Sequence, residues 1–398
     1  MKKRFVQSTR ALCALVVICS VFSACSGPSG ETGGSSSAEK ASSLQSSASL
    51  SSEDLSVAAA AKKIIQKQTS AQGTWTGPTT GPKAAKGKSI VCINADSKNA
   101  VEAMWGEGTA EAAKKIGWKC TVLDGKGTVN GQTQALNQAI SMKVDGIVTS
   151  ADVQALQETL GQAKAAGIPV VGIHGSAVSG ADEKDQLLYN CTTPGTAIGK
   201  ALADYVIADS NGKGRVIVLY DSLYAIARQK AEAMKSELAT CPGVRLLDYV
   251  NSPLAQVPTN MPQLASSWIS KYGGTSSDPL YVLSIADYYY DFVTPTLRSG
   301  NVDPSGVRLL GCDGTTEAYN RIRSGNYQVA TVPEPTTEFP YIAIDELNRY
   351  FNGQPVVNYT PEPYIVTKDN IDKEGGDKGL FIPSNNFADE YAKIWGVQ

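Results

Sequence analysis

The chain has 398 residues, a formal net charge of −2, and Lys and Arg residues dispersed along its length. This balanced charge, with no basic patch and no helix-turn-helix module, excludes nucleic acid as an expected partner. The part beyond residue 52, about 340 residues, exceeds what one hydrophobic core usually organises, so two domains are expected.

The N-terminus has the features of an export signal. MKKR is followed by the apolar run 11–24 and then by Cys25. A run of about 14 residues is shorter than the roughly 20 that a membrane-spanning helix needs, so residues 1–24 are predicted to be a signal peptide. Residues 21–25 resemble a bacterial lipobox, with Phe22 in place of the usual leucine. We therefore expect a protein outside the cytoplasm, anchored to the bacterial membrane through a lipidated Cys25. Plain secretion is the alternative.

Two segments precede the first predicted sheet. Residues 25–52 are dominated by Ser, Gly and Ala, which cannot bury enough apolar surface to fold, and they are predicted to be a disordered tether. Residues 53–87 form an N-terminal extension in which AAAAKKIIQ favours a helix and the later Pro and Gly residues favour an extended path. Trp75 is expected either to pack on the first domain or to approach a ligand cleft.

From residue 88 onward, apolar strands alternate with amphipathic helices. The first series of predicted strands is 89–95, 119–124, 144–150 and 168–173, and the second is 215–220, 244–250, 280–286, 308–313 and 327–332. This alternation predicts an α/β fold with two doubly wound parallel sheets and right-handed crossovers. In such sheets ligands bind beyond the carboxyl ends of the strands, so residues at the strand tips are the candidate site.

Sequence motifs for catalysis are missing. The chain has no G-x-S-x-G, no H-E-x-x-H, no P-loop and a single histidine, His174, at the end of the fourth predicted strand. We therefore expect no enzyme activity, no metal and no cofactor. A glycosidase built on Asp287, Asp313 and Glu334 is the enzymatic alternative, and nothing in the sequence sets the separation of these carboxylates.

The five cysteines after Cys25 are odd in number and none has C-x-x-C spacing. They are expected to be free thiols that pack as small apolar residues. A disulfide between Cys191 and Cys312 is the alternative.

Polar and aromatic residues gather at the predicted strand tips. They are Asp96, Asn99, Asp152, His174, Lys230, Asp287, Tyr288, Tyr289, Tyr290, Asp313 and Glu334. Carboxylates and amides bind adjacent hydroxyls, and aromatic faces cover the C–H face of a sugar ring, so this mixture suits a polyhydroxylated ligand. In a purely structural interpretation Asp287 caps a helix, Asp313 is a turn residue, and His174 is a neutral imidazole bound to a backbone carbonyl.

The stretches 108–174 and 309–332, which contain "DG", "AGIPVV" and "G-x-DG", resemble the type I periplasmic binding proteins of ABC importers, related to ribose-binding protein. The resemblance covers about residues 88–366. It implies two lobes joined by a three-strand hinge, with crossings near 190–193, 334–336 and 359. The implied lobes are 88–191 plus 335–358, and 192–334 plus 359–398.

The same resemblance implies a ligand-binding set, with several departures from the ribose pattern. Val101 and Glu102 stand where two stacking phenylalanines are usual, and His174 with Gly175 replaces an Asp-Arg pair. We predict that His174 supplies part of the hydrogen bonding that the Asp-Arg pair would give to ligand hydroxyls, and that Trp105 or Tyr288 supplies an aromatic ring on which the ligand stacks. The predicted ligand-binding residues are Asn99, Glu102, Trp105, His174, Lys230, Asp287, Tyr288, Asp313 and Glu334.

The resemblance also implies a function. The chain is expected to be a monomeric solute-binding lipoprotein that captures a small polar ligand, a sugar or polyol, and delivers it to an ABC permease and its ATPase. The alternative is a receptor for an autoinducer or nucleoside that presents its closed form to a sensor protein.

Overall fold

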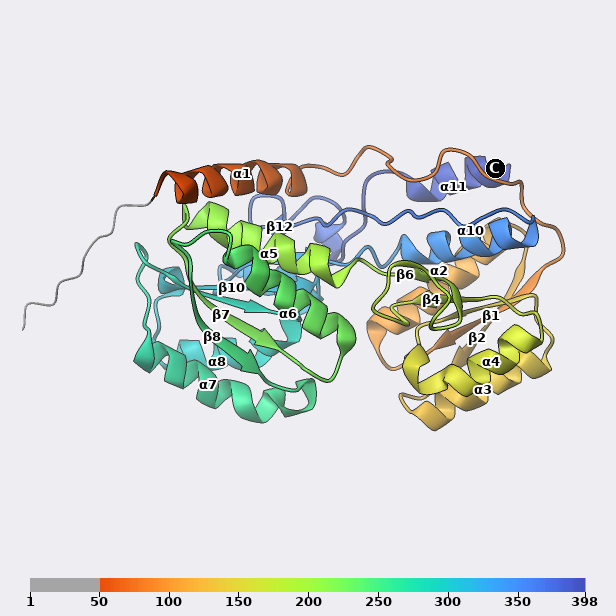
Figure 1. The fold of residues 1–398 in the computed structure, drawn as a ribbon, viewed down its shortest axis with the longest axis horizontal. Coiled ribbons are helices and arrows are strands. Elements are labelled where there is room, and N and C mark those ends of the chain that lie inside the picture. Colours follow the sequence, from red (N-terminus) through yellow and green to blue (C-terminus); the bar gives the residue numbers. More distant parts are fainter. Residues whose placement is uncertain (1–50, 398) are drawn as a thin grey trace, which may run out of the picture. The chain divides into compact units, whose positions relative to one another are not determined.

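The computed structural model describes residues 51–397 (Figure 1). The predicted signal peptide, Cys25 and nearly all of the predicted tether lie outside the described residues. Within the described part, no helix is both long enough and apolar enough to cross a membrane.

The first sheet has six strands in the order β2-β1-β3-β4-β6-β5. Their bounds are β1 Ser89–Asn94, β2 Lys119–Asp124, β3 Gly146–Thr149, β4 Val170–Ile173, β5 Gly180–Asp182 and β6 Leu187–Cys191. All neighbours pair in parallel except the edge strand β5, which is antiparallel to β6. Because side chains alternate along a strand, Ile90 and Val91 contribute to two different core clusters.

The second sheet also has six strands, in the order β12-β11-β10-β9-β7-β8. Their bounds are β7 Arg215–Tyr220, β8 Arg245–Asn251, β9 Leu280–Ser284, β10 Val307–Asp313, β11 Gln328–Pro333 and β12 Val366–Thr367. Only β12 is antiparallel to its neighbour. The predicted α/β class with two doubly wound lobes is confirmed. Three strands were not in the predicted series: the parallel strand β6, and the short antiparallel strands β5 and β12, one at an edge of each sheet.

Helices cover both sheets. With the first sheet pack α2 Ala100–Lys115, α3 Val129–Ser141, α4 Gln157–Ala165 and α10 Phe339–Phe351. The second lobe contains α5 Gly195–Asp209, α6 Ala225–Leu238, α7 Val257–Lys271, α8 Tyr290–Ser299 and α9 Thr316–Ser324. Gly167 and Gly325 follow α4 and α9 with φ of 72° and 68°, a conformation that favours glycine and stops a helix.

The N-terminal extension contacts both lobes. Its helix α1, Ser52–Gln68, packs against α5 through Ala58 and Ala61, and the Asp54 carboxylate accepts a hydrogen bond from Gly243 N at 2.8 Å. The chain then runs to the first lobe, where the ring of Trp75 lies 5.5 Å from Tyr359 and 5.2 Å from Tyr391. Of the two predicted positions for Trp75, the structure therefore places it against the first lobe.

The C-terminal end also differs from the predicted lobe boundaries. The final helix, α11 Phe387–Trp395, packs on α10, with Trp395 stacked 6.1 Å from Tyr341 and its indole N–H donating to Asp345 at 2.8 Å. The assignment of all of 359–398 to the second lobe is therefore wrong for α11. Segments 69–87 and 381–386 cross between the lobes in addition to the three predicted crossings, and periodicity could not reveal them because neither is a regular element.

All five cysteines of the described chain are free, and four of them are buried. The alternative bridge between Cys191 and Cys312 is not formed. Burial raises the pKa of the Cys191 and Cys312 thiols well above its usual value, so both stay neutral.

Glu338 lies at the crossing that precedes α10 and is fully buried. Its carboxyl group accepts hydrogen bonds from the Tyr359 hydroxyl at 2.8 Å and from Asn385 Nδ2 at 3.5 Å. Burial raises the pKa of Glu338 to about 7, although the two hydrogen bonds act in the opposite direction. Because this folded pKa exceeds the unfolded value of about 4.3, the group stabilises the fold fully below about pH 4, and this stabilisation is lost as the pH rises through 7.

Between pH 5 and pH 8 we expect the free energy of unfolding of the parent to fall by roughly 2 kcal/mol more than that of Glu338→Gln. The amide keeps the shape of the neutral carboxyl group and does not titrate. Urea denaturation of both proteins at the two pH values measures this difference. Parallel pH profiles of parent and variant would contradict the assigned titration.

Candidate functional site

His174 follows β4 in an uncommon backbone conformation. Its φ is 57°, and its N–H donates to the carbonyl of Cys191 at the end of β6, at 3.0 Å. The imidazole lies parallel to the indole of Trp105, at a centroid distance of 5.4 Å and an interplanar angle of 15°, and 5.8 Å from the ring of Phe339. A residue held at positive φ that is not glycine is often found at a functional site.

Glu334 follows β11 and faces His174. Its Oε2 lies 3.6 Å from His174 Nε2, which is ion-pair distance but too long for a hydrogen bond. The residue is 5% exposed, and within residues 51–397 neither carboxylate oxygen has a hydrogen-bond partner. Burial raises the pKa of Glu334, but His174, Lys230 and Thr193 outweigh it and hold the pKa below the ordinary value. Glu334 is therefore a buried carboxylate whose acceptors are free for a ligand.

Lys230 and Asp313 form a second charged pair beside Glu334. Lys230, on α6, places its Nζ 3.4 Å from Asp313 Oδ1, 3.4 Å from the carbonyl of Ile285 and 3.2 Å from Cys312 Sγ. Burial lowers the pKa of Lys230, but the neighbouring Cys312 sulfur, Asp313 and Glu334 outweigh it and raise the pKa overall, so the ammonium stays charged. The ammonium of Lys230 therefore faces both carboxyl groups of the site, those of Asp313 and Glu334.

Several other buried polar atoms near these residues have no partner in the described part of the chain. They are Trp105 Nε1, His174 Nε2, Thr193 Oγ1 and Thr336 Oγ1. Buried polar groups are normally hydrogen-bonded, so each unpartnered one needs an explanation. Together with Glu334 they provide donors and acceptors for one small polar molecule. We call Trp105, His174, Thr193, Lys230, Asp313 and Glu334 the tip cluster.

Thr193 is a member that sequence reasoning missed. It lies in the predicted crossing 190–193, directly after β6, and is 3% exposed. Its position at the end of a strand was the available signal, because every strand tip of a doubly wound sheet is a candidate position.

Three predicted ligand contacts make internal contacts instead. Asn99 caps α2 by accepting a hydrogen bond from Val101 N at 2.9 Å. Glu102 accepts from Asp96 N at 2.7 Å and from the Ser150 hydroxyl at 3.0 Å. Both roles are local to the first lobe, and neither residue contacts the tip cluster through a hydrogen bond or ion pair in the described chain.

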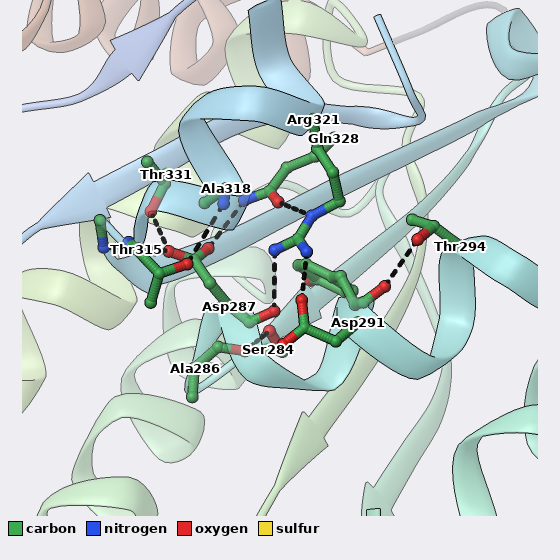
Figure 2. A network of polar contacts seen from close by, with 12 residues as sticks. Ser284, Ala286, Asp287, Asp291, Thr294, Thr315, Ala318, Arg321, Gln328 and Thr331 are labelled. Carbon is green, nitrogen blue, oxygen red and sulfur yellow. Dashed lines mark hydrogen bonds and ion pairs between the residues drawn. The ribbon is translucent and has the colours of Figure 1, made fainter. Parts of the chain in front are cut away.

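Asp287 is the third predicted ligand contact with partners inside the protein, and Figure 2 shows the hydrogen-bond network around it. Its two carboxylate oxygens accept hydrogen bonds from Gly314 N, Thr315 N, the Thr331 hydroxyl and Gln328 Nε2, at 2.9, 3.3, 2.8 and 2.7 Å. Burial and the charge of Asp313 raise the pKa of Asp287 to about 7, against these hydrogen bonds and the charge of Arg321. With both oxygens occupied by protein donors, the geometry gives Asp287 a structural role in place of the predicted ligand contact.

Tyr288, one of the two predicted ring platforms, is 40% exposed, and its ring meets Phe292 edge-on at 5.3 Å. Trp105, the other, is 7% exposed and stacked on His174. The structure thus brings Trp105, His174 and Glu334 together, and leaves Tyr288 outside this group.

Two cavities lie away from the tip cluster. The larger, of about 440 Å³, is lined by α1, α5 and residues 367–373. Among its polar groups Asp209 accepts from Tyr281 and Lys62 donates to Asn211, whereas Asp369 and Lys373 are exposed to solvent. The smaller, of about 50 Å³, borders Glu338. We place the site at the tip cluster because polar atoms are buried there without partners, whereas no residue that lines the larger cavity has a buried side-chain polar atom without a partner in the described chain.

Residues 90–355 match the model of the periplasmic binding protein domain family. The chain is 24% identical over 251 residues to the xylitol-binding protein of Mycolicibacterium smegmatis, covering 61% of this chain and 67% of the relative. Among solved structures, a periplasmic ribose ABC transporter protein from Conexibacter woesei is 19% identical with a TM-score of 0.63, covering 74% of this chain and 96% of that one. An allitol-bound solute-binding protein from Agrobacterium vitis is 19% identical with a TM-score of 0.60, covering 72% and 98%.

Proposed function

The chain belongs to the periplasmic binding protein domain family, and from that membership we propose that it is the solute-binding component of an ABC importer. In this proposal the tip cluster captures a small sugar or polyol, and the loaded protein delivers it to a membrane permease with its ATPase. The observation that carries the proposal is the buried Glu334 carboxylate, whose two oxygens have no hydrogen-bond partner in the described chain. Two neighbouring hydroxyls of a ligand would donate to these oxygens and offset the cost of burying the charge.

The charge of the tip cluster supports an uncharged ligand. Glu334, whose pKa is held below its ordinary value, and Asp313, whose pKa is raised by burial and by Glu334, both face the ammonium of Lys230, which leaves no spare lysine or arginine in the tip cluster to bind an anionic ligand. Proteins similar to this chain bind ligands of the proposed kind: the names of the relatives mention xylitol, allitol and ribose. The proposal contains no catalytic step, because the similar proteins named above are solute-binding or transport proteins.

Attachment to the membrane forms part of the proposal. The lipobox-like residues 21–25 would place the protein outside the cytoplasm with Cys25 acylated, and Cys25 lies outside the described residues. A Cys25→Ala variant should move from the membrane fraction to the soluble fraction. Retention of this variant in the membrane would argue against the anchor.

Thermal unfolding of the full chain against a panel of sugars, polyols, sugar acids, nucleosides and amino acids tests the binding function. A ligand at 100 times its Kd stabilises by about 2.7 kcal/mol, which shifts the unfolding midpoint by several degrees. We expect a shift with at least one neutral sugar or polyol and none with sugar acids. If only nucleosides or amino acids shift the midpoint, the proposed cargo is wrong.

A further inference from the structure

We propose that His174 determines ligand specificity by covering the indole face of Trp105, so that the site selects an open-chain polyol over a flat sugar ring. This inference rests on the proposed function and narrows its ligand class.

Binding of a sugar ring usually uses a free aromatic face against the C–H face of the ring. In the first lobe the available indole is that of Trp105, and the parallel imidazole of His174 at 5.4 Å takes this position. Trp105 is only 7% exposed and belongs to the first-lobe core, so its remaining surface is buried. Phe339, whose ring lies 5.8 Å from the imidazole at an interplanar angle of 53°, is fully buried. The imidazole thus occupies the space that a sugar ring would need.

The aromatic residues of the second lobe do not replace this platform. Tyr289 and Tyr290 are fully buried, and their hydroxyls donate to backbone carbonyls. Tyr220 packs on Tyr249 at 4.5 Å. Tyr224, half exposed at the start of α6, has no ring contact, hydrogen bond or ion pair with the tip cluster in the described chain.

The free polar atoms fit an open chain of hydroxyls. The Trp105 indole N–H is a donor, the two Glu334 oxygens are acceptors, and the Thr193 hydroxyl is both. Each hydroxyl of an open-chain polyol donates and accepts, and rotation about its C–C bonds brings successive hydroxyls to donors and acceptors at different angles. A rigid ring would satisfy the same atoms only by stacking where His174 already lies.

The test compares the parent protein with a variant that removes the ring at position 174. His174→Asn suits the positive φ, because asparagine is enriched in this conformation, and it keeps a polar side chain. Titration calorimetry measures Kd for xylitol and sorbitol, each against the cyclic sugar of the same configuration, xylose and glucose. The midpoint of thermal unfolding confirms that the variant is folded.

In the parent we expect at least one open-chain polyol to bind at least tenfold more tightly than its cyclic partner. His174→Asn should reduce this preference at least tenfold by gaining affinity for the cyclic sugar. The double variant His174→Asn with Trp105→Leu should lose that gain again. A parent that prefers the cyclic sugar overturns the inference and leaves the proposed function standing. An unchanged preference in folded His174→Asn overturns the role of His174. If no sugar or polyol of either kind binds the parent, the proposed function itself fails.

Discussion

Replacing Glu334 with alanine will weaken binding of the ligand at least 100-fold without lowering the unfolding midpoint of the ligand-free protein. Both carboxylate oxygens are buried and have no hydrogen-bond partner within residues 51–397, so their removal breaks no hydrogen bond of the fold. In the loaded protein each would accept a hydrogen bond, and bonds to a charged group are worth about 1.5 to 3 kcal/mol each. Loss of two such bonds exceeds the roughly 2.7 kcal/mol that corresponds to 100-fold in Kd.

Glu346 provides a matched control for this experiment. It is also a buried glutamate, but its two oxygens accept hydrogen bonds from Val357 N at 3.0 and 3.2 Å. Glu346→Ala should therefore lower the unfolding midpoint and leave the Kd of the folded protein unchanged, the opposite pattern to Glu334→Ala. Titration calorimetry measures the Kd of each variant, and thermal unfolding measures the midpoint of each ligand-free variant. Unchanged affinity in Glu334→Ala would remove Glu334 from the site.

Replacing Asp287 with alanine will lower the free energy of unfolding by about 4 kcal/mol. Four donors surround this carboxylate (Figure 2). Two are backbone N–H groups of the segment after β10, and two are side chains of β11, Gln328 and Thr331. Arg321 also donates to the Asp287 carbonyl at 3.1 Å and pairs with Asp291, so the network joins η3 (Asp287–Tyr289) and α8 to α9. Alanine leaves the four donors buried without an acceptor, which costs free energy for each.

Urea denaturation measures this loss, and calorimetry on the folded variant measures ligand affinity. We expect the Kd to stay within a few-fold of the parent, because Asp287 has no free oxygen for a ligand. Asp372 is the control: it pairs with Arg323 at 3.0 Å but is 79% exposed, so Asp372→Ala should cost less than 1 kcal/mol. A stable Asp287→Ala variant with weakened binding would restore Asp287 as the ligand contact that the sequence predicted.

Local periodicity was sufficient to predict most of the fold. The predicted strands 119–124 and 215–220 coincide with β2 and β7. In β7 the four central residues are buried, and a parallel strand covered on both faces appears as a short apolar run between turn residues. The edge strand β2 is largely exposed and was found from its place in the alternation of strands and helices. The position of His174 at a strand tip followed from the same pattern. The parallel strand β6 and the edge strands β5 and β12 were missed, the two edge strands because they are short and antiparallel.

Which strand-tip residues remain free for a ligand depended on contacts between distant parts of the chain. Asp287 and Glu334 are both acidic residues at strand tips, and sequence offers no way to separate them. Asp287 is occupied by Gln328 and Thr331, 41 and 44 residues away, whereas among residues 51–397 the one ion-pair partner of Glu334 is His174. Likewise, α1 joins the second lobe through contacts such as Asp54 with Gly243, 189 residues apart. Strands and their tips follow from short-range side-chain alternation, which the sequence displays directly. The partners of each polar group are set by three-dimensional packing. Only the tertiary structure therefore decided which carboxylate stabilises the fold and which has oxygens free for a ligand.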